Sequence, residues 1–353
     1  MKVIRTLHAW VGLTLGLLFL LSSFTGTLLI WKEDYVRLTT PEARVDFDPT
    51  PQALARIGEA IEARFDNNDI LGIQFATRAF PLTRVTLLDT NYAYVDVEGN
   101  VVDQWYMNDR IEEWLYDLHH RLLLEDLGLT ITGLAALAGI VLVLMGLLTF
   151  IPLRRQFSRR LVPGSMKRSV LVASHRNLGI VISLPLLMTL VTGAMLAFPF
   201  EVEEIFLDEL RRKQEYSDAM VVGIDSVSGE GQGDWLPALE RTRAVFPEGE
   251  IRSATVPGGY SIHRVIGVQQ QGTWNRTGLS KTYIDAELGY MDLRIDAQGF
   301  PLLERTINAG YPLHTGRTGS LVYKLLITLS GAGIFLLVFC AITSFIKSRL
   351  KIA

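Results

Sequence analysis

The residues of this chain with the clearest chemistry are four of its six histidines, which stand at the entrances of four long apolar segments. Neutral imidazoles are good iron ligands, and two of them on opposite faces of a haem leave no open position on the metal. Such a site transfers electrons. The pattern predicts two b-type haems per chain, with the iron ligands His8, His119, His175 and His314.

Small residues follow two of these histidines at helical spacing. Positions four and eight residues beyond a histidine share its helix face. The residues at those positions are all small: Gly12, Gly16, Gly179 and Ser183. We expect the missing side chains to leave room for a flat macrocycle. The alternative is close packing of two membrane helices through small residues, which explains the glycines but not the histidines.

Arginines stand within three residues of the predicted ligands. A guanidinium binds a carboxylate through two parallel hydrogen bonds, so these side chains are candidates to hold haem propionates. The alternative for Arg5 and Arg176 is that they only mark the cytoplasmic side of the membrane. The four candidates are Arg5, Arg121, Arg176 and Arg317.

Two neighbouring histidines compete for the ligand position before the second apolar segment. Helical spacing places His119 on an apolar stripe with Trp114 and Leu118, and places His120 among charged residues. His119 is therefore the better ligand, with His120 as the alternative. A straight helix would put His119 about 12 Å before the membrane span that begins near Leu127, at or above the lipid headgroups.

The last predicted ligand, His314, lies in a segment with three glycines at positions 310, 316 and 319. Glycines at this density are typical of a loop that approaches a ligand closely. We therefore expect His314 to be presented from a loop or from the turn that leads into the last helix.

The elements that must hold these residues are membrane helices. The chain has 353 residues, of which 49% are hydrophobic, and four stretches reach the roughly 20 residues that cross a bilayer. The first is expected to be a retained anchor and not a cleaved signal peptide. The four predicted spans are Trp10–Trp31, Leu127–Pro152, Leu178–Phe200 and Leu321–Ile346.

Charge sets the expected orientation. Twelve of the 34 lysines and arginines lie in three short segments: before the first span, between the second and third spans, and after the fourth span. These segments contain no acidic residue. Both termini and the loop between the second and third spans should therefore be cytoplasmic, which places the two large loops on the outer side of the membrane. The remaining 22 basic and 37 acidic residues give the rest of the chain a net charge of about −15. A surface this acidic argues against nucleic acid as a partner.

Each large loop reads as a small α+β unit. The first has an amphipathic helix over 51–65, strands near 84–89 and 92–97, and a hairpin turn at 98–100. The second has a helix over 235–246 and strands near 260–269, 281–286 and 290–296.

The halves of the chain match each other. His8-x-x-x-Gly12 and Thr25-Gly26 recur 167 residues later, and Leu118-His119 recurs 195 residues later. We therefore expect an α-helical membrane protein with α+β extracytoplasmic insertions, in which helix, insertion and helix occur twice. The expected segments are helix 1 (1–32), insertion 1 (33–108), a lead-in with helix 2 (109–153), a basic loop (154–176), helix 3 (177–200), insertion 2 (201–308), a His-bearing loop with helix 4 (309–346) and a tail (347–353).

These features resemble the PepSY-associated membrane proteins, which include bacterial iron-regulated membrane proteins and ferric-siderophore reductases. The resemblance covers nearly the whole chain. It rests on the His-x-x-x-Gly and Thr-Gly motifs of the first span, the Tyr94-Val95-Asp96 strand with Gly99, and the segment Leu313–Gly316. It implies an inner-membrane protein with PepSY-like insertions that reduces a ferric siderophore, or another ferric chelate, on the periplasmic side.

The electron donor must be a separate molecule, a membrane quinol or a cytoplasmic reductase, because no Gly-x-Gly-x-x-Gly dinucleotide motif follows a strand. No catalytic residue is assigned, and a homo-oligomer stays open. One alternative is a haem-free scaffold whose insertions bind a peptide or a partner protein. A proton-coupled transporter is less favoured, because the centres of the spans carry no Asp, Glu, Lys or Arg.

Overall fold

The computed structural model describes residues 2–208, 220–222, 231, 233–258 and 261–350. The chain divides into two compact units. The helical unit comprises Met1–Trp31, Leu115–Val202 and Gly310–Ala353, and the sheet unit comprises Lys32–Trp114 and Glu203–Ala309. Each is described by itself.

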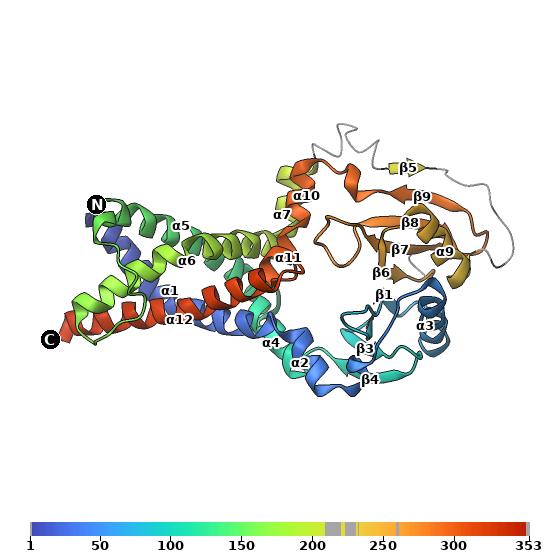
Figure 1. Ribbon diagram of the computed structural model, residues 1–353, viewed down its shortest axis with the longest axis horizontal. Helices are drawn as coiled ribbons and strands as arrows, with labels where there is room; N and C mark the ends of the chain where they lie inside the picture. The colour runs from blue at the N-terminus through green and yellow to red at the C-terminus, as the bar shows by residue number, and fades with distance from the viewer. Residues whose placement is uncertain (1, 209–219, 223–230, 232, 259–260, 351–353) are drawn as a thin grey trace. The chain divides into compact units, whose positions relative to one another are not determined.

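The helical unit contains four helices that are long and apolar enough to cross a membrane, as predicted. Each contacts two of the others, in the order α1, α5, α6, α12 and back to α1 (Figure 1). Two of them begin before the apolar stretch, so His8 and His175 lie inside helices and not ahead of them. The bounds are α1 (Lys2–Leu29), α5 (Glu125–Phe150, continued by the 3-10 helix η2, Ile151–Gln156), α6 (Arg168–Ala197) and α12 (Leu321–Leu350).

Two short helices carry the other paired histidines. His119 lies on α4 (Ile111–Arg121), which begins in the sheet unit and continues into the helical unit, and His314 lies on α11 (Gly310–Thr315). The loop predicted for His314 is therefore wrong. Its glycines flank the helix instead of breaking it: Gly310 opens α11, and Gly316, with φ +73°, follows its end in the left-handed conformation.

The predicted straight continuation from His119 toward Leu127 is also wrong. The chain reverses direction between α4 and α5 through left-handed residues at Leu122, Leu123 and Glu125, with φ of 52°, 59° and 51°. The hydroxyl of Thr132 on α5 donates to the carbonyl of His120, 2.9 Å away. The end of α4 therefore lies beside α5 and not above it.

The sheet unit is built on one nine-stranded antiparallel sheet with the order β4-β3-β2-β1-β6-β7-β8-β9-β5. The five predicted strands correspond to β2, β3, β7, β8 and β9, and the predicted hairpin turn lies at Gly99 (φ +93°), between β3 and β4. The start of the predicted strand at Tyr260 lies outside the described residues. The bounds are β1 (Ile70–Gln74), β2 (Thr83–Leu87), β3 (Asn91–Val95), β4 (Val101–Tyr106), β5 (Met220–Val222), β6 (Glu250–Thr255), β7 (His263–Gln269), β8 (Ser280–Asp285) and β9 (Met291–Ile295).

Both insertions contribute to this sheet, which they join through β1 and β6. Ile73 pairs with Ala254, and the amide of Phe75 donates to the carbonyl of Arg252 at 2.9 Å. The predicted helices α3 (Pro51–Arg64) and α9 (Trp235–Val245) pack against the sheet in a shared apolar core (Figure 1).

A second, smaller core lies on the other face of β3. It contains Tyr94, whereas the neighbouring Ala93 and Val95 belong to the first core, because successive side chains of a strand point to opposite faces. Its members are Val36, Ala43, Leu82, Tyr94 and Trp105. Val36 and Ala43 come from α2 (Lys32–Thr39) and the 3-10 helix η1 (Pro41–Arg44). The remaining helices of the described residues are α7 (Pro199–Phe206), which follows α6, the 3-10 helix η3 (Ala297–Gly299) and α10 (Leu302–Asn308).

Candidate functional site: two histidine pairs

The structure brings the four predicted histidines together as two pairs within the helical unit. In the first histidine pair, the ring centroids of His8 on α1 and His175 on α6 are 6.2 Å apart, with an angle of 81° between the ring planes. In the second histidine pair, the centroids of His119 on α4 and His314 on α11 are 6.0 Å apart at 43°. All four side chains are half-buried.

Each histidine of the first pair is oriented by a backbone carbonyl on a neighbouring helix. Nδ1 of His8 is 3.1 Å from the carbonyl oxygen of Leu142 on α5, and Nδ1 of His175 is 2.9 Å from that of Leu337 on α12. A carbonyl can only accept, so Nδ1 carries the proton. Each Nε2 is then left with its lone pair, as a metal ligand requires.

The second pair repeats this arrangement with one addition. Nδ1 of His119 donates to the carbonyl of Ser22 at 2.9 Å, and Nδ1 of His314 donates to that of Thr189 at 3.0 Å. A threonine hydroxyl oxygen also lies 3.1 Å from each Nδ1, from Thr25 in one case and Thr192 in the other. The ring of His119 is therefore held by two groups of α1, and the ring of His314 by two groups of α6.

The geometry of the pairs suits iron between two imidazoles. Two metal–nitrogen bonds of about 2 Å each, with half a ring beyond each nitrogen, span about 6 Å. In the described part of the chain no hydrogen bond is formed by the Nε2 atom of any of the four. The pairs therefore fit the predicted haem, whose binding stays a prediction.

The glycines predicted to make room for a macrocycle differ in what surrounds them. A Cβ atom added at Gly12 would meet no atom within 4 Å, and one added at Gly179 would meet only Leu337 Cδ2, at 3.8 Å. At Gly16 an added Cβ would make a van der Waals contact with Val338 Cγ1, 3.4 Å away. Open space therefore lies beyond each histidine of the first pair, one helical turn along.

The four predicted arginines lie in different surroundings. Arg176 donates to the side chain and the carbonyl of Gln156, both at 2.9 Å, and Arg317 donates to the hydroxyl of Tyr311 at 3.3 Å. Arg5 is exposed beside a groove near the start of α1. Nε of Arg121 is buried and has no hydrogen-bond partner among the described residues. Their roles toward propionates stay predictions.

The two competing histidines are separated by the structure, since the imidazole that faces His314 is that of His119. The ring of His120 stacks on Tyr116, with centroids 5.3 Å apart. The amphipathic pattern behind this choice was only partly right, however. Asp117 is buried on the side expected to be polar, whereas Trp114 on the expected apolar stripe is 37% exposed.

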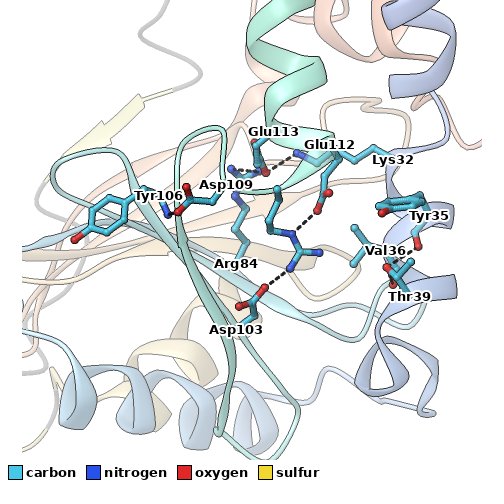
Figure 2. A network of polar contacts seen from close by, with 11 residues as sticks. Lys32, Tyr35, Val36, Thr39, Arg84, Asp103, Tyr106, Asp109, Glu112 and Glu113 are labelled. Carbon is cyan, nitrogen blue, oxygen red and sulfur yellow. Dashed lines mark hydrogen bonds and ion pairs between the residues drawn. The ribbon is translucent and has the colours of Figure 1, made fainter.

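Ion pairs in the sheet unit explain why acidic residues of α4 are buried (Figure 2). Glu113 accepts from Lys32 Nζ at 2.8 Å and pairs with Arg84 at 3.3 Å. Burial alone would raise the pKa of Glu113, but the charges of Lys32 and Arg84 outweigh it and the pKa is lowered. Sequence spacing could not reveal this network, because its partners are far apart along the chain.

The neighbouring Glu112 takes part in the same network. It pairs with Arg110, which also pairs with Asp103; Figure 2 labels the two acidic residues, Glu112 and Asp103. The guanidinium of Arg110 also lies over the ring of Trp105, 4.8 Å from the ring centroid. Together the two glutamates fix the first turn of α4.

The described residues of both units include no cluster of three or more His, Cys, Asp or Glu side chains able to hold a metal ion. A ferric substrate is therefore not assigned to any residue. His263 pairs with Asp292 on the sheet and belongs to the sheet unit, whereas both histidine pairs belong to the helical unit.

Comparison with known proteins adds one result. The model of the family described as the PepSY-associated TM region matches residues 5–347. A search of curated proteins finds no match to the chain.

Proposed function

The chain belongs to the PepSY-associated transmembrane family, and from this premise we propose that it is a bis-haem b electron-transfer protein that reduces a ferric chelate. The substrate class would be ferric siderophores, and reduction would occur on the periplasmic side of a bacterial inner membrane. The observation that carries the proposal is the pairing of four histidines at ring-centroid distances of 6.0 and 6.2 Å, with every Nδ1 bound to a carbonyl.

The four histidines would hold the two haems, His8 and His175 one of them and His119 and His314 the other. Haem iron with two imidazoles supplies a one-electron carrier with no site for oxygen. The backbone carbonyls hold each ring in the Nδ1–H tautomer and leave Nε2 to the metal. Arg121, whose Nε has no partner among the described residues, is the strongest candidate to hold a propionate.

The two pairs lie at different levels along the bundle. His8 and the carbonyl of Ser22, which holds His119, are 14 residues apart on α1, a distance of about 21 Å along a helix. Two carriers at two levels would connect the two membrane faces. The basic flanking segments support placing the first pair on the cytoplasmic side.

Matching contacts support the inference that the chain is a repeat of helix, insertion and helix. The carbonyls of Leu142 and Leu337, which hold the first pair, are 195 residues apart. Thr25 and Thr192, which contact the second pair, are 167 residues apart. Both offsets equal those of the sequence repeats, so each pair would take one histidine from each half.

The proposed reaction moves one electron from a separate donor, a quinol or a cytoplasmic reductase, to Fe(III) of the chelate. Oxygen ligands suit hard cations such as Fe(III). Reduction to Fe(II) weakens their hold, and the iron is released for uptake.

The test is the haem content and the oxidised and reduced absorption spectra of the detergent-purified protein. We expect two low-spin b-type haems per chain by pyridine haemochrome assay. The double variant His8→Ala/His175→Ala should keep one haem, and His119→Ala/His314→Ala should keep the other. The controls His120→Ala and His263→Ala should keep both.

Two results would contradict the proposal. Retention of both haems in either double variant would remove the ligand assignment. A wild-type protein without haem would remove the electron-transfer function and leave a scaffold that binds a peptide or a partner protein as the better account.

A further inference from the structure

Two Thr-Gly dipeptides, Thr25-Gly26 on α1 and Thr192-Gly193 on α6, contact the second histidine pair. Both threonines are buried, at 0% and 5% exposure. We propose that these dipeptides are positioning elements that fix the rings of His119 and His314 and set the reduction potential of the second pair apart from that of the first. This inference rests on the proposed function.

The threonine hydroxyls can only accept from the histidines. Oγ1 of Thr25 lies 2.9 Å from the carbonyl of Leu21 on its own helix, and Oγ1 of Thr192 lies 2.7 Å from that of Met188. A carbonyl cannot donate, so the hydroxyl proton points to it. The hydroxyl oxygen is left to accept from the imidazole Nδ1–H at 3.1 Å.

Each Nδ1–H of the second pair therefore faces two acceptors, a carbonyl and a hydroxyl. Among the described residues, each Nδ1–H of the first pair has one acceptor, the carbonyl of Leu142 for His8 and that of Leu337 for His175. An imidazole whose Nδ1–H donates to more or stronger acceptors is a more basic metal ligand. A more basic ligand stabilises Fe(III) over Fe(II), which lowers the reduction potential.

The glycine of each dipeptide lets the ring approach the helix backbone. A Cβ atom at Gly26 would lie 2.8 Å from Cε1 of His119, and one at Gly193 would lie 3.0 Å from Cε1 of His314. A contact of 2.8 Å is essentially never seen for a real Cβ atom, and a contact of 3.0 Å would require the ring of His314 to shift by a few tenths of an ångström. Glycine is therefore needed for the imidazole to reach the threonine hydroxyl one residue earlier.

The experiment is a potentiometric titration of the purified holoprotein, with the ferric low-spin EPR spectrum as a second measurement. Thr25→Val removes the acceptor and keeps the shape of the side chain. We expect the midpoint potential of one haem to rise and its EPR signal to change, while the other haem keeps both. Thr25→Ser, which restores the hydroxyl, should return both values toward the wild type.

A matched control is available two residues along the same helix. Oγ1 of Thr27 is buried and has no hydrogen-bond partner among the described residues, so Thr27→Val should change neither haem. Gly26→Ala should weaken retention of the second haem, on the scale of about 10- to 100-fold seen when outer-shell partners of metal ligands are removed.

The outcomes separate the two claims. If the wild type holds two haems and Thr25→Val leaves both potentials and both EPR signals unchanged, the inference is wrong and the proposed function stands. If a first-pair haem responds instead, the assignment of the dipeptide is wrong. If the wild type holds no haem, both are overturned.

Discussion

At the scale of single residues, the proposed haem at the first pair gives a reason for glycine at position 12. Alanine in a helix interior is favoured over glycine by about 1 kcal/mol, and a Cβ at this position meets nothing within 4 Å. Gly12→Ala should therefore leave the apoprotein as stable as the wild type, or more stable. Haem retention at the first pair should fall, because the methyl group occupies the open space.

The measurement for Gly12→Ala is thermal unfolding of apoprotein and holoprotein beside the haem-to-protein ratio. Gly164→Ala, at a loop position that is also open within 4 Å, is the control and should keep two haems. Full haem occupancy in Gly12→Ala would show that the glycine serves only helix packing.

The angles between the imidazole planes make a second prediction at this scale. The planes of the first pair are 81° apart and those of the second pair 43° apart. The low-spin ferric EPR signal of a bis-histidine haem depends on this angle, so the oxidised protein should give two distinct signals. The double variant His8→Ala/His175→Ala should lose the signal of the more perpendicular pair. A single signal from a protein with two haems would contradict the described ring geometry.

The four histidines could be predicted from the sequence because their positions repeat beside apolar segments. The groups that form hydrogen bonds with their rings could not be predicted from the sequence. The carbonyls of Leu142 and Leu337 belong to residues whose side chains carry no signal of this role. The Thr-Gly repeat was visible in the sequence, but its contact with His119 and His314 depends on how α4 and α11 fold back.

At the scale of elements, the reversal between α4 and α5 depends on Gly128. A Cβ atom there would lie 1.5 Å from the carbonyl oxygen of Arg121, so backbone would have to move. We expect Gly128→Ala to shift the end of α4, which carries His119, and to reduce retention of the haem of the second pair by at least several-fold. The haem-to-protein ratio and the EPR spectrum measure this.

The control for Gly128→Ala is Gly179→Ala. The Cβ added at Gly179 makes only an ordinary contact, 3.8 Å from the nearest atom. This control should affect the haem of the first pair and leave that of the second pair in place. Loss of the first-pair haem in Gly128→Ala would contradict the role of the turn.

The first turn of α4 should respond to pH through Glu113. Its pKa is lowered below the ordinary value of 4.5, so its contribution to stability is fully present above about pH 4.5 and is lost as pH falls through the lowered pKa. Glu113→Gln leaves Lys32 and Arg84 without their shared carboxylate and should destabilise the sheet unit by about 2 kcal/mol at pH 7.

The difference between the wild type and Glu113→Gln should shrink as pH falls below about 4.5, and thermal unfolding followed down to about pH 3.5 measures it. Asp48→Asn removes an exposed ion pair with Arg78 and should have no measurable effect at any pH. An equal loss of stability in Glu113→Gln at all pH values would contradict the ionised state of Glu113.

Long periodic elements were predicted better than short ones. The four spans and the helices α3 and α9 have hydrophobic patterns that continue over many residues. By contrast, α11 is six residues long and has glycine at its start and just past its end, which the sequence cannot distinguish from a loop. The strand β1 contains Gly72 and a register shift after Ile70, so its alternation is interrupted.

At the scale of the whole molecule, the two insertions form one folded body although 88 residues, 115–202, separate them in the sequence. Trp235 on α9 lies against Gly58 on α3, its Nε1 donates to Glu62 at 3.0 Å, and the guanidinium of Arg264 lies over its ring. Removing this side chain should cost about 3–5 kcal/mol. Trp235→Ala should therefore destabilise strands of both insertions together.

Hydrogen exchange of the detergent-purified protein measures this. We expect amides of β2 and β3 to lose protection in Trp235→Ala together with those of β7 and β8. Trp274→Ala, which removes a side chain that is 48% exposed, should leave protection unchanged. Faster exchange confined to the strands of the second insertion would show that the insertions fold separately.

The way the pairs are divided along the chain also sets an order of events during protein synthesis. The first pair lacks a partner until His175 has been made, and the ring of His175 is not fully held until Leu337 on α12 follows. The second pair waits for His314. If the pairs hold haem as proposed, a growing chain completes the second pair only with His314 and holds the first pair fully only with Leu337, so cofactor loading would be a late step in synthesis.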